Sequence, residues 1–197
     1  TKHYDPLLDL YLYRNCRFML ASGGGGRQAS LFYGKDTIVT NWAPLHLSGY
    51  CFHEGDRFIA KHLYSKRQKR LLSLREQLSL LNEETDRWGF FNPKHFEVVE
   101  NSPDEIKSAV VNYLDGKIQK DFDWCDTLQT AYSDLRQEKT RIRNEQLKKT
   151  FGYESEFEVY HHIRPKLDRD FLKNCWEYGP YLEEVTERFK RSRVDPG

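Results

Sequence analysis

A run of four glycines is the feature of the sequence that most clearly indicates a ligand-binding site. The glycines occupy positions 23–26, after an apolar run at residues 16–21 and before residues 27–33, which have the apolar spacing of a short helix. Backbone N–H groups at the start of such a helix can face an anion, because the helix dipole is positive there and glycine lets a ligand approach the backbone. The run therefore predicts a site for an anion such as a diphosphate. A flexible surface turn is the alternative interpretation.

The glycine run matches neither of two common phosphate-binding motifs. In a G-x-G-x-x-G dinucleotide fingerprint the third glycine would fall on Gln28. The pair Gly34-Lys35 has no glycine five residues before it, as a P-loop requires. Any anion site at the run is therefore of another kind.

Lys61 is a candidate partner for that anion. It lies in the weakly alternating segment 56–64, which we expect to form a strand followed by a turn. A lysine that returns toward the glycine run would neutralise a phosphate as a point charge. A solvated surface lysine is the alternative.

The irregular segment after Asn41 contains three candidates for proton transfer: His46, His53 and Glu54. Long loops inside compact domains are often binding loops, although each of these residues also commonly serves as a structural hydrogen-bonding group. The histidines of the sequence form no H-x-x-x-H or H-E-x-x-H motif, so we expect no metal site.

A strand–loop–helix–strand unit is expected to position the glycine run. Residues 16–21 predict a buried strand, and the β-branched residues 36–40 predict a second one. The helix between them should end at Gly34, where a left-handed C-cap favours glycine. Ala29, Leu31 and Phe32 are expected to face the core.

Helix-start signals recur along the rest of the chain. Asp5-Pro6 predicts a helix with aspartate as its N-cap, and its apolar side should pack against the glycine-loop unit. Ser73 and Ser102 each begin a capping box with a glutamate three residues later, and Gly116 is expected to end the second of these helices. The apolar side of the first helix consists of Leu7, Leu8, Leu10, Tyr11 and Leu12.

Helices and strands alternate through residues 1–117, which predicts an α/β fold with a mostly parallel sheet and helices on both faces. The pattern then changes. Residues 122–149 contain no glycine or proline, and Leu128, Leu135 and Ile142 recur every seven positions, so we expect a long amphipathic helix. Short helices follow near 168–176 and 181–191. We therefore expect one domain at 1–117 and a helical C-terminal extension at 118–197 that packs on it.

Composition limits the classes of partner and compartment. The 197 residues carry 31 Lys and Arg against 30 Asp and Glu, so no global field favours nucleic acid or an anionic membrane. No apolar stretch approaches the roughly 20 residues of a membrane-spanning helix, and the first residues have no signal-peptide pattern. The four cysteines share no C-x-x-C spacing, which favours reduced thiols. We expect a cytoplasmic protein.

Several blocks of sequence, taken in order, carry a family resemblance. They are DLYLYRNCRFMLASGGGG (9–26), GKDTIVTNWAPL (34–45), DRFIAKHLY (56–64), LLSLREQL (71–78) and FEVVENSPDEI (96–106), with DRDFLKN (168–174) as a weaker match. In this order they resemble a family of bacterial glycosyltransferases associated with surface polysaccharide.

The resemblance implies a GT-B-like enzyme, in which two Rossmann-like halves face each other and the C-terminal half holds an activated sugar nucleotide. Asn41 and the loop after it would line the nucleotide or sugar, and Lys61 would offset phosphate charge. Contacts to the diphosphate or sugar would come from Ser22, Gly23, Gly24, Gly25, Gly26 and Gln28. The glycine run departs from the family, where Ser-Gly is more often followed by an apolar residue, which puts the side-chain contacts there in doubt but leaves the backbone contacts.

The resemblance implies that residues 1–117 form one such half, the Rossmann-like donor-binding domain. The expected function is a glycosyltransferase, or its donor-binding half, that moves a sugar from a nucleotide-diphosphate donor to a glycan hydroxyl without a cofactor. The acceptor site and catalytic base would then be absent, belong to a further domain or subunit that completes the cleft, or be replaced by another residue of this chain. Two alternatives stay open: a non-catalytic nucleotide- or glycan-binding module, and an interaction protein built around the helix at 122–149.

Overall fold

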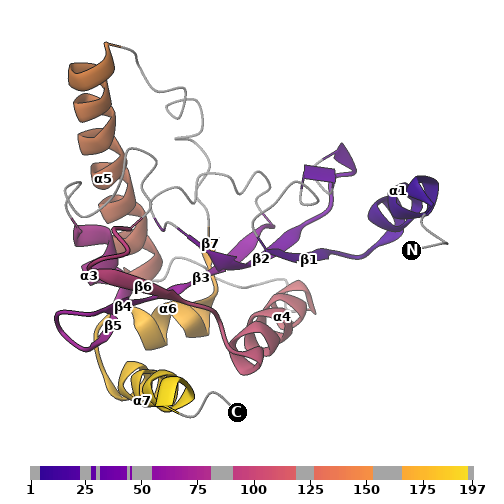
Figure 1. Cartoon of the computed structure of the whole chain (residues 1–197). Coiled ribbons are helices and arrows are strands. Elements are labelled where there is room, and N and C mark those ends of the chain that lie inside the picture. Colours follow the sequence, from indigo (N-terminus) through magenta and orange to yellow (C-terminus); the bar gives the residue numbers. More distant parts are fainter. Residues whose placement is uncertain are drawn as a thin grey trace.

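A computed structural model describes most of the chain and its element order (Figure 1). The described residues are 5–22, 28–29, 32–43, 45, 55–80, 91–118, 127–152 and 166–194. The elements are α1 (Pro6–Asn15), β1 (Met19–Ser22), β2 (Thr37–Trp42), β3 (Arg57–Ala60), β4 (His62–Ser65), β5 (Arg70–Leu72), α3 (Leu74–Ser79), β6 (Phe96–Val99), α4 (Pro103–Ile118), α5 (Thr127–Phe151), β7 (Lys166–Leu167), α6 (Arg169–Cys175) and α7 (Pro180–Val194).

A parallel sheet organises the fold. Its four strands lie in the order β1-β2-β3-β7, and every neighbouring pair is parallel. Helices flank this sheet, with α4 packed against β2 and β3. The expected α/β class with a parallel sheet is therefore confirmed, and it is consistent with a Rossmann-like fold. The boundary expected near residue 117 stays a prediction.

The fourth strand of this sheet comes from the C-terminal part of the chain, where the sequence indicated helices alone. Leu167 of β7 pairs with Phe58 of β3, and the side chain of Gln129 in α5 accepts a hydrogen bond from the Leu167 amide at 3.2 Å. A two-residue strand is too short to show a period-two pattern, so only its pairing identifies it.

A second, antiparallel sheet was not predicted. Its strand order is β5-β4-β6, and β4 follows β3 after the single residue Lys61. The turn between β4 and β5 contains Lys69 with a φ of 55°, in the left-handed region. The expected strand at residues 56–64 is confirmed by β3, but the expected turn after it is wrong: a second strand, β4, follows instead, and the turn comes only after it.

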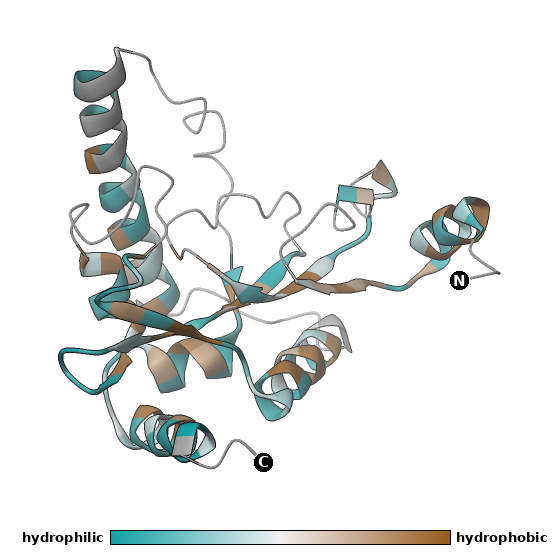
Figure 2. Ribbon diagram, in the orientation of Figure 1, coloured by the Kyte–Doolittle hydropathy of each residue, from teal (hydrophilic) through white to brown (hydrophobic). Residues whose placement is uncertain are grey.

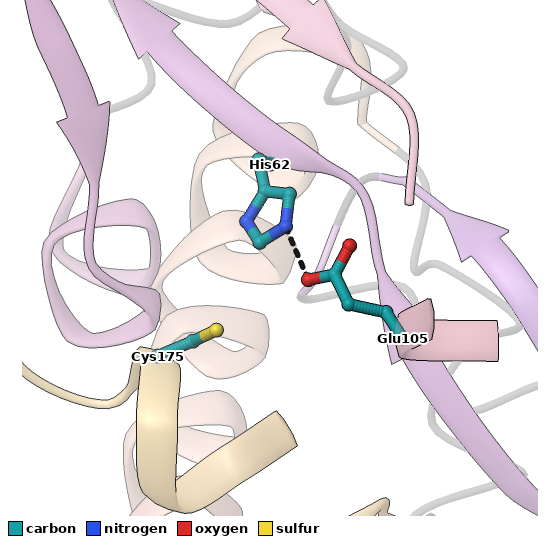
Figure 3. Close-up of side chains that lie close together, drawn as sticks. All are labelled: His62, Glu105 and Cys175. Atoms are coloured by element: carbon teal, nitrogen blue, oxygen red, sulfur yellow. Dashed lines mark hydrogen bonds and ion pairs between the residues drawn. The ribbon is translucent and has the colours of Figure 1, made fainter. Parts of the chain in front are cut away.

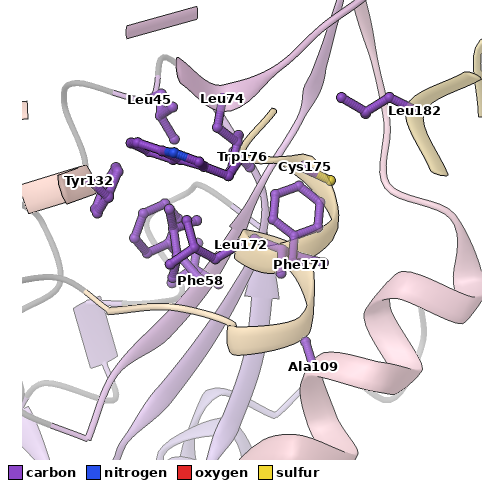
Figure 4. Close-up of a cluster of buried hydrophobic side chains, with 14 of the residues drawn as sticks. Leu45, Phe58, Leu74, Ala109, Tyr132, Phe171, Leu172, Cys175, Trp176 and Leu182 are labelled. Atoms are coloured by element: carbon purple, nitrogen blue, oxygen red, sulfur yellow. The ribbon is translucent and has the colours of Figure 1, made fainter. Parts of the chain in front are cut away.

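The hydrophobic core lies between the sheets and the helices that flank them. Hydrophobic residues gather along the strands, whereas the coloured part of α5 is mostly hydrophilic (Figure 2). Phe58 of β3 and Tyr132 of α5 are almost fully buried, and their ring centroids lie 6.0 Å apart. Figure 4 shows this cluster with Trp176 and Leu172 from the end of the chain, so the C-terminal residues share one core with the parallel sheet.

Most predicted helix starts are confirmed. The Asp5 carboxylate accepts a hydrogen bond from the Leu7 amide, and Ser73 forms a complete capping box. Ser102 forms the second box, in which its own amide donates to the Glu105 carboxylate and its hydroxyl accepts from the Glu105 amide. One predicted end is wrong: α4 continues through Gly116 to Ile118, because no left-handed residue stops it there.

The expected burial of the first helix is wrong. None of the residues of α1 is buried, and Leu7 is 72% exposed. Figure 1 shows α1 beyond β1, at the edge of the structure. Phe32 is likewise 88% exposed instead of facing the core. Periodicity identifies the residues that share a face, but another element must still cover that face.

Two further expectations can be compared with the structure. Gly34 has a φ of 62°, as expected for the end of the short helix. Helix α5 (Thr127–Phe151) overlaps most of the predicted range 122–149 and ends two residues beyond it. Its Ile142 is 36% exposed, and its buried side includes the polar residues Gln129, Ser133 and Arg136. In the described part of the chain, no helix is both long and apolar enough to cross a bilayer.

Candidate functional site

Three of the predicted ligand-binding residues lie at the carboxyl ends of adjacent parallel strands. Ser22 is the last residue of β1 and pairs with Thr40, which directly precedes Asn41 in β2. Lys61 directly follows Ala60, which pairs with Trp42 at the end of β2. Neighbouring strands lie about 4.8 Å apart, so the three residues share one edge of the sheet. We call Ser22, Asn41, Lys61, Glu100 and Asn101 the strand-end site.

Asn41 has an unusual backbone conformation. Its φ is 54°, in the left-handed region that side chains other than those of asparagine and aspartate rarely adopt. The pairing of β2 with β3 is irregular between Val39 and Trp42, where this residue lies. Such conformations persist when surrounding contacts enforce them.

The contact that enforces the conformation is a reciprocal pair with Asn101. The Asn41 amide donates to the Asn101 side-chain oxygen at 2.8 Å, and the Asn101 amide donates to the Asn41 side-chain oxygen at 2.6 Å. The Asn101 side-chain nitrogen also donates to the carbonyl of Ala60 at 2.7 Å. Asn101 is only 7% exposed, and it connects the ends of β2 and β3 through two part-buried hydrogen bonds to Asn41 and one buried hydrogen bond to Ala60.

Lys61 carries the cation of the strand-end site. Its amide donates to the carbonyl of Trp42 at 2.8 Å, which fixes the backbone at this point. Its ammonium group lies 3.0 Å from a carboxylate oxygen of Glu100, and 27% of the Lys61 side chain is exposed against 71% for Glu100. The lysine charge is therefore held at the strand ends by a partner that is largely in solvent.

The remaining predicted residues are only partly described. Gln28 is exposed and lies in a helical segment. The residues Gly23, Gly24, Gly25, Gly26, His46, His53 and Glu54 lie outside the described residues. Their proposed roles in anion binding and proton transfer stay predictions.

Glu100 and Asn101 were missed as site residues. Both belong to the block FEVVENSPDEI, which was interpreted only as a strand followed by a helix start. The asparagine before Ser102-Pro103 was the available signal, because asparagine often hydrogen-bonds backbone near turns. Its partners are 60 and 41 residues away, so no local pattern reveals them.

A second polar cluster is buried near the start of α4 (Figure 3). The Glu105 carboxylate lies 2.7 Å from His62 Nε2 and accepts a hydrogen bond from the Tyr181 hydroxyl at 2.6 Å. Its other oxygen accepts from the Ser102 amide at 2.7 Å. Burial opposes ionisation of Glu105, but the hydrogen bonds from His62, Tyr181 and Ser102 lower its pKa to about 2. Burial raises the pKa of Tyr181, and its hydrogen bond to Glu105 raises it further.

His62, Glu105 and Cys175 are the residues in the described part of the chain that could hold a metal ion. One ligand atom from each lies within 4.8 Å of the others. Burial raises the pKa of the Cys175 thiol well above its usual range, so the neutral thiol predominates. Both oxygens of Glu105 already accept hydrogen bonds from the chain. The geometry therefore favours a structural hydrogen-bond cluster that joins β4, α4 and α7.

A cavity of about 280 Å³ adjoins this cluster. Its lining includes the acidic residues Asp104, Glu105, Asp168, Asp170 and Glu184 and the single cation Arg188. Burial raises the pKa of Asp168, against hydrogen bonds from the Phe171 amide and Asn112. Carboxylates repel phosphate, so this cavity does not suit a diphosphate, and the strand-end site is the better candidate.

Comparisons of the chain with protein-family models, with curated proteins and with solved structures give no match.

Proposed function

We propose that this chain is the sugar-nucleotide-binding half of a glycosyltransferase of GT-B type. It would bind a nucleotide-diphosphate sugar, whose sugar is transferred to a hydroxyl of a glycan acceptor. The proposal joins the sequence resemblance to one structural observation. That observation is the alignment of Ser22, Asn41 and Lys61 at the carboxyl ends of three adjacent parallel strands.

This location supports ligand binding on general grounds. In open α/β sheets, ligands bind in the crevice outside the carboxyl ends of the strands. The reciprocal pair of Asn41 and Asn101 fixes the backbone at that edge, and a rigid site loses less entropy when a ligand binds. Lys61 adds a cation at the same edge.

The proposed chemistry is stabilisation of the leaving group. When the bond between sugar and diphosphate breaks, negative charge develops on the departing nucleoside diphosphate. Amide groups of residues 23–26, which directly follow Ser22, would donate hydrogen bonds to that charge, and the Lys61 ammonium would offset it. The acceptor glycan and the base that activates its hydroxyl would be supplied by a further domain or subunit.

Donor binding is the direct test. The chain is screened by thermal shift against nucleoside diphosphates and their sugars, because a ligand that prefers the native state raises the melting temperature. Titration calorimetry then gives the affinity of the best ligand. We expect at least one nucleotide-diphosphate sugar to bind, and the absence of binding across the whole panel would refute the proposal.

A matched pair of variants tests where the ligand binds. Replacing Gly24 and Gly25 by valine should abolish binding, because β-branched side chains block the close approach of the diphosphate to the backbone. Gly179→Val is the control, since a Cβ there meets nothing within 4 Å and the residue precedes a proline. Unchanged affinity in the double variant would exclude the glycine run as the binding segment.

Turnover separates the enzyme half from a non-catalytic binding module. The chain with a bound donor is assayed for slow hydrolysis of the sugar nucleotide. Hydrolysis above the rate of the Gly24→Val/Gly25→Val variant supports the transferase half, because stabilisation of the leaving group does not need the acceptor or its base. Binding without hydrolysis favours the module.

A further inference from the structure

We propose that Glu100 competes with the donor diphosphate for Lys61 and thereby sets the affinity of the strand-end site. In the free protein Glu100 holds the lysine at the carboxyl end of β3. A bound diphosphate takes its place. The inference rests on the proposed function, because it concerns the same site.

The geometry fixes both ends of this ion pair. The backbone of Lys61 is anchored by its hydrogen bond to Trp42. Glu100 directly precedes Asn101, and the Asn101 side chain donates a hydrogen bond to the carbonyl of Ala60. Ala60 is in turn the residue before Lys61. The two charged side chains therefore extend from backbone segments that are themselves connected, which brings them to 3.0 Å.

Exposure makes the pair easy to exchange. The Glu100 side chain is 71% exposed, so its carboxylate regains water when it releases the lysine. Exposed ion pairs are weak, and breaking this one should cost about two- to fivefold in ligand affinity. A diphosphate offers at least two negative charges where Glu100 offers one, so it is the stronger partner for the lysine.

The ion pair between Glu187 and Lys190 does not have this arrangement. Glu187 and Lys190 lie one helical turn apart on α7, at 2.8 Å, and neither is at the end of a parallel strand. Glu187→Gln makes the same chemical change as Glu100→Gln but lies outside the strand-end site. It therefore serves as the control.

A double-mutant cycle with inorganic pyrophosphate tests the inference. The full chain and the variants Glu100→Gln, Lys61→Met and Glu100→Gln/Lys61→Met are titrated by calorimetry at low salt. Glu100→Gln should bind pyrophosphate about two- to fivefold more tightly than the wild type. Lys61→Met should bind about tenfold more weakly. In the Lys61→Met background, Glu100→Gln should change affinity less than in the wild type, because the cation it competes for is gone.

Salt supplies a second readout that a change in folding would not produce. The increase in pyrophosphate affinity caused by Glu100→Gln should be smaller at 0.5 M salt, because the screening length at that concentration is only about 4 Å. Melting temperatures of all variants are measured to confirm that each is folded.

The outcomes distinguish this inference from the proposed function. If the wild type binds pyrophosphate and Glu100→Gln leaves the affinity unchanged, weakens it, or matches Glu187→Gln, the competition is refuted and the donor site survives. If Glu100→Gln tightens binding equally with and without Lys61, the carboxylate acts on the ligand directly and the inference is also wrong. If neither the wild type nor Glu100→Gln binds pyrophosphate or a nucleoside diphosphate, both proposals fail.

Discussion

The contact between Asn41 and Asn101 makes a quantitative prediction for stability. Asn101→Ala removes two side-chain hydrogen bonds, the one accepted from the Asn41 amide and the one donated to the Ala60 carbonyl. Ala60 is 1% exposed, so water cannot easily replace the lost donor. An unsatisfied buried polar group costs about 1–3 kcal/mol. Two such groups should lower the free energy of unfolding by about 2–6 kcal/mol.

The assay is equilibrium unfolding in urea, with the slope and the midpoint fitted for each variant. Asn92→Ala is the matched control, because the Asn92 side chain accepts one hydrogen bond from the Lys94 amide in an exposed turn. Asn92→Ala should lower the free energy of unfolding by less than about 1 kcal/mol. Hydrogen exchange of the Asn41 amide gives a local readout and should become faster in Asn101→Ala.

The backbone of Asn41 can be tested in the same way. Asn41→Ala loses the side-chain acceptor and also places alanine at a φ of 54°, whereas Asn41→Gly loses the acceptor alone. The alanine variant should therefore be about 1 kcal/mol less stable than the glycine variant. The reasoning is refuted if Asn101→Ala costs no more than Asn92→Ala, or if alanine and glycine at position 41 are equally stable.

Three further predictions concern the second cluster and a close contact. The pKa of Glu105 is lowered from 4.5 to about 2, so its ionised form stabilises the fold above pH 4.5. As the pH falls from about 5 to 2, up to about 3 kcal/mol of the unfolding free energy should be lost. Urea titrations across this range should show a smaller loss for Glu105→Gln, and parallel curves would contradict the assignment. In a variant that keeps Cys175 as its only cysteine, a thiol reagent should react only after unfolding, because Cys175 is buried and its pKa is raised. Rapid reaction of the native variant would contradict this prediction. Gly55→Ala should destabilise the protein by about 1–3 kcal/mol, because a Cβ at position 55 would overlap the Asp36 carboxylate. In the control Gly179→Ala the new Cβ meets open space, so the loss of stability should be clearly smaller. Equal melting temperatures of the two variants would contradict the clash.

Part of the candidate site could be predicted because its residues follow strands that are visible in the sequence. The β-branched residues of β2 mark that strand, so Asn41 could be placed near its end. The carboxyl ends of parallel strands lie at one edge of a sheet, and polar residues there are binding candidates. The local sequence around Glu100 and Asn101 did not reveal their partners, because Asn41, Ala60 and Lys61 lie in or beside the other sheet.

The extent of the parallel sheet was predictable only in part. The strands β1, β2 and β3 follow one another along the chain, and the alternation of elements indicated their parallel arrangement. The pairing of β7 with β3 and the antiparallel sheet depend on segments that meet only after the chain has folded. Short strands of two to four residues carry too little pattern to define their partners.

The sequence by itself determined the features that local contacts control. The N-cap at Asp5, the capping boxes at Ser73 and Ser102, and the left-handed turn at Gly34 each involve residues within four positions of one another. Hydrogen bonds over such short spans form in the same way wherever the helix packs, so the residue types are sufficient.

Tertiary structure decided which surfaces are covered and which polar groups meet. The apolar residues of α1 remain exposed because no described element packs on them, although their spacing suits burial. Asn101 reaches Asn41 across 60 residues, and Glu100 reaches Lys61 across 39. Burial and charge pairing are properties of neighbours in space, and the order of residues along the chain specifies those neighbours only through the completed fold.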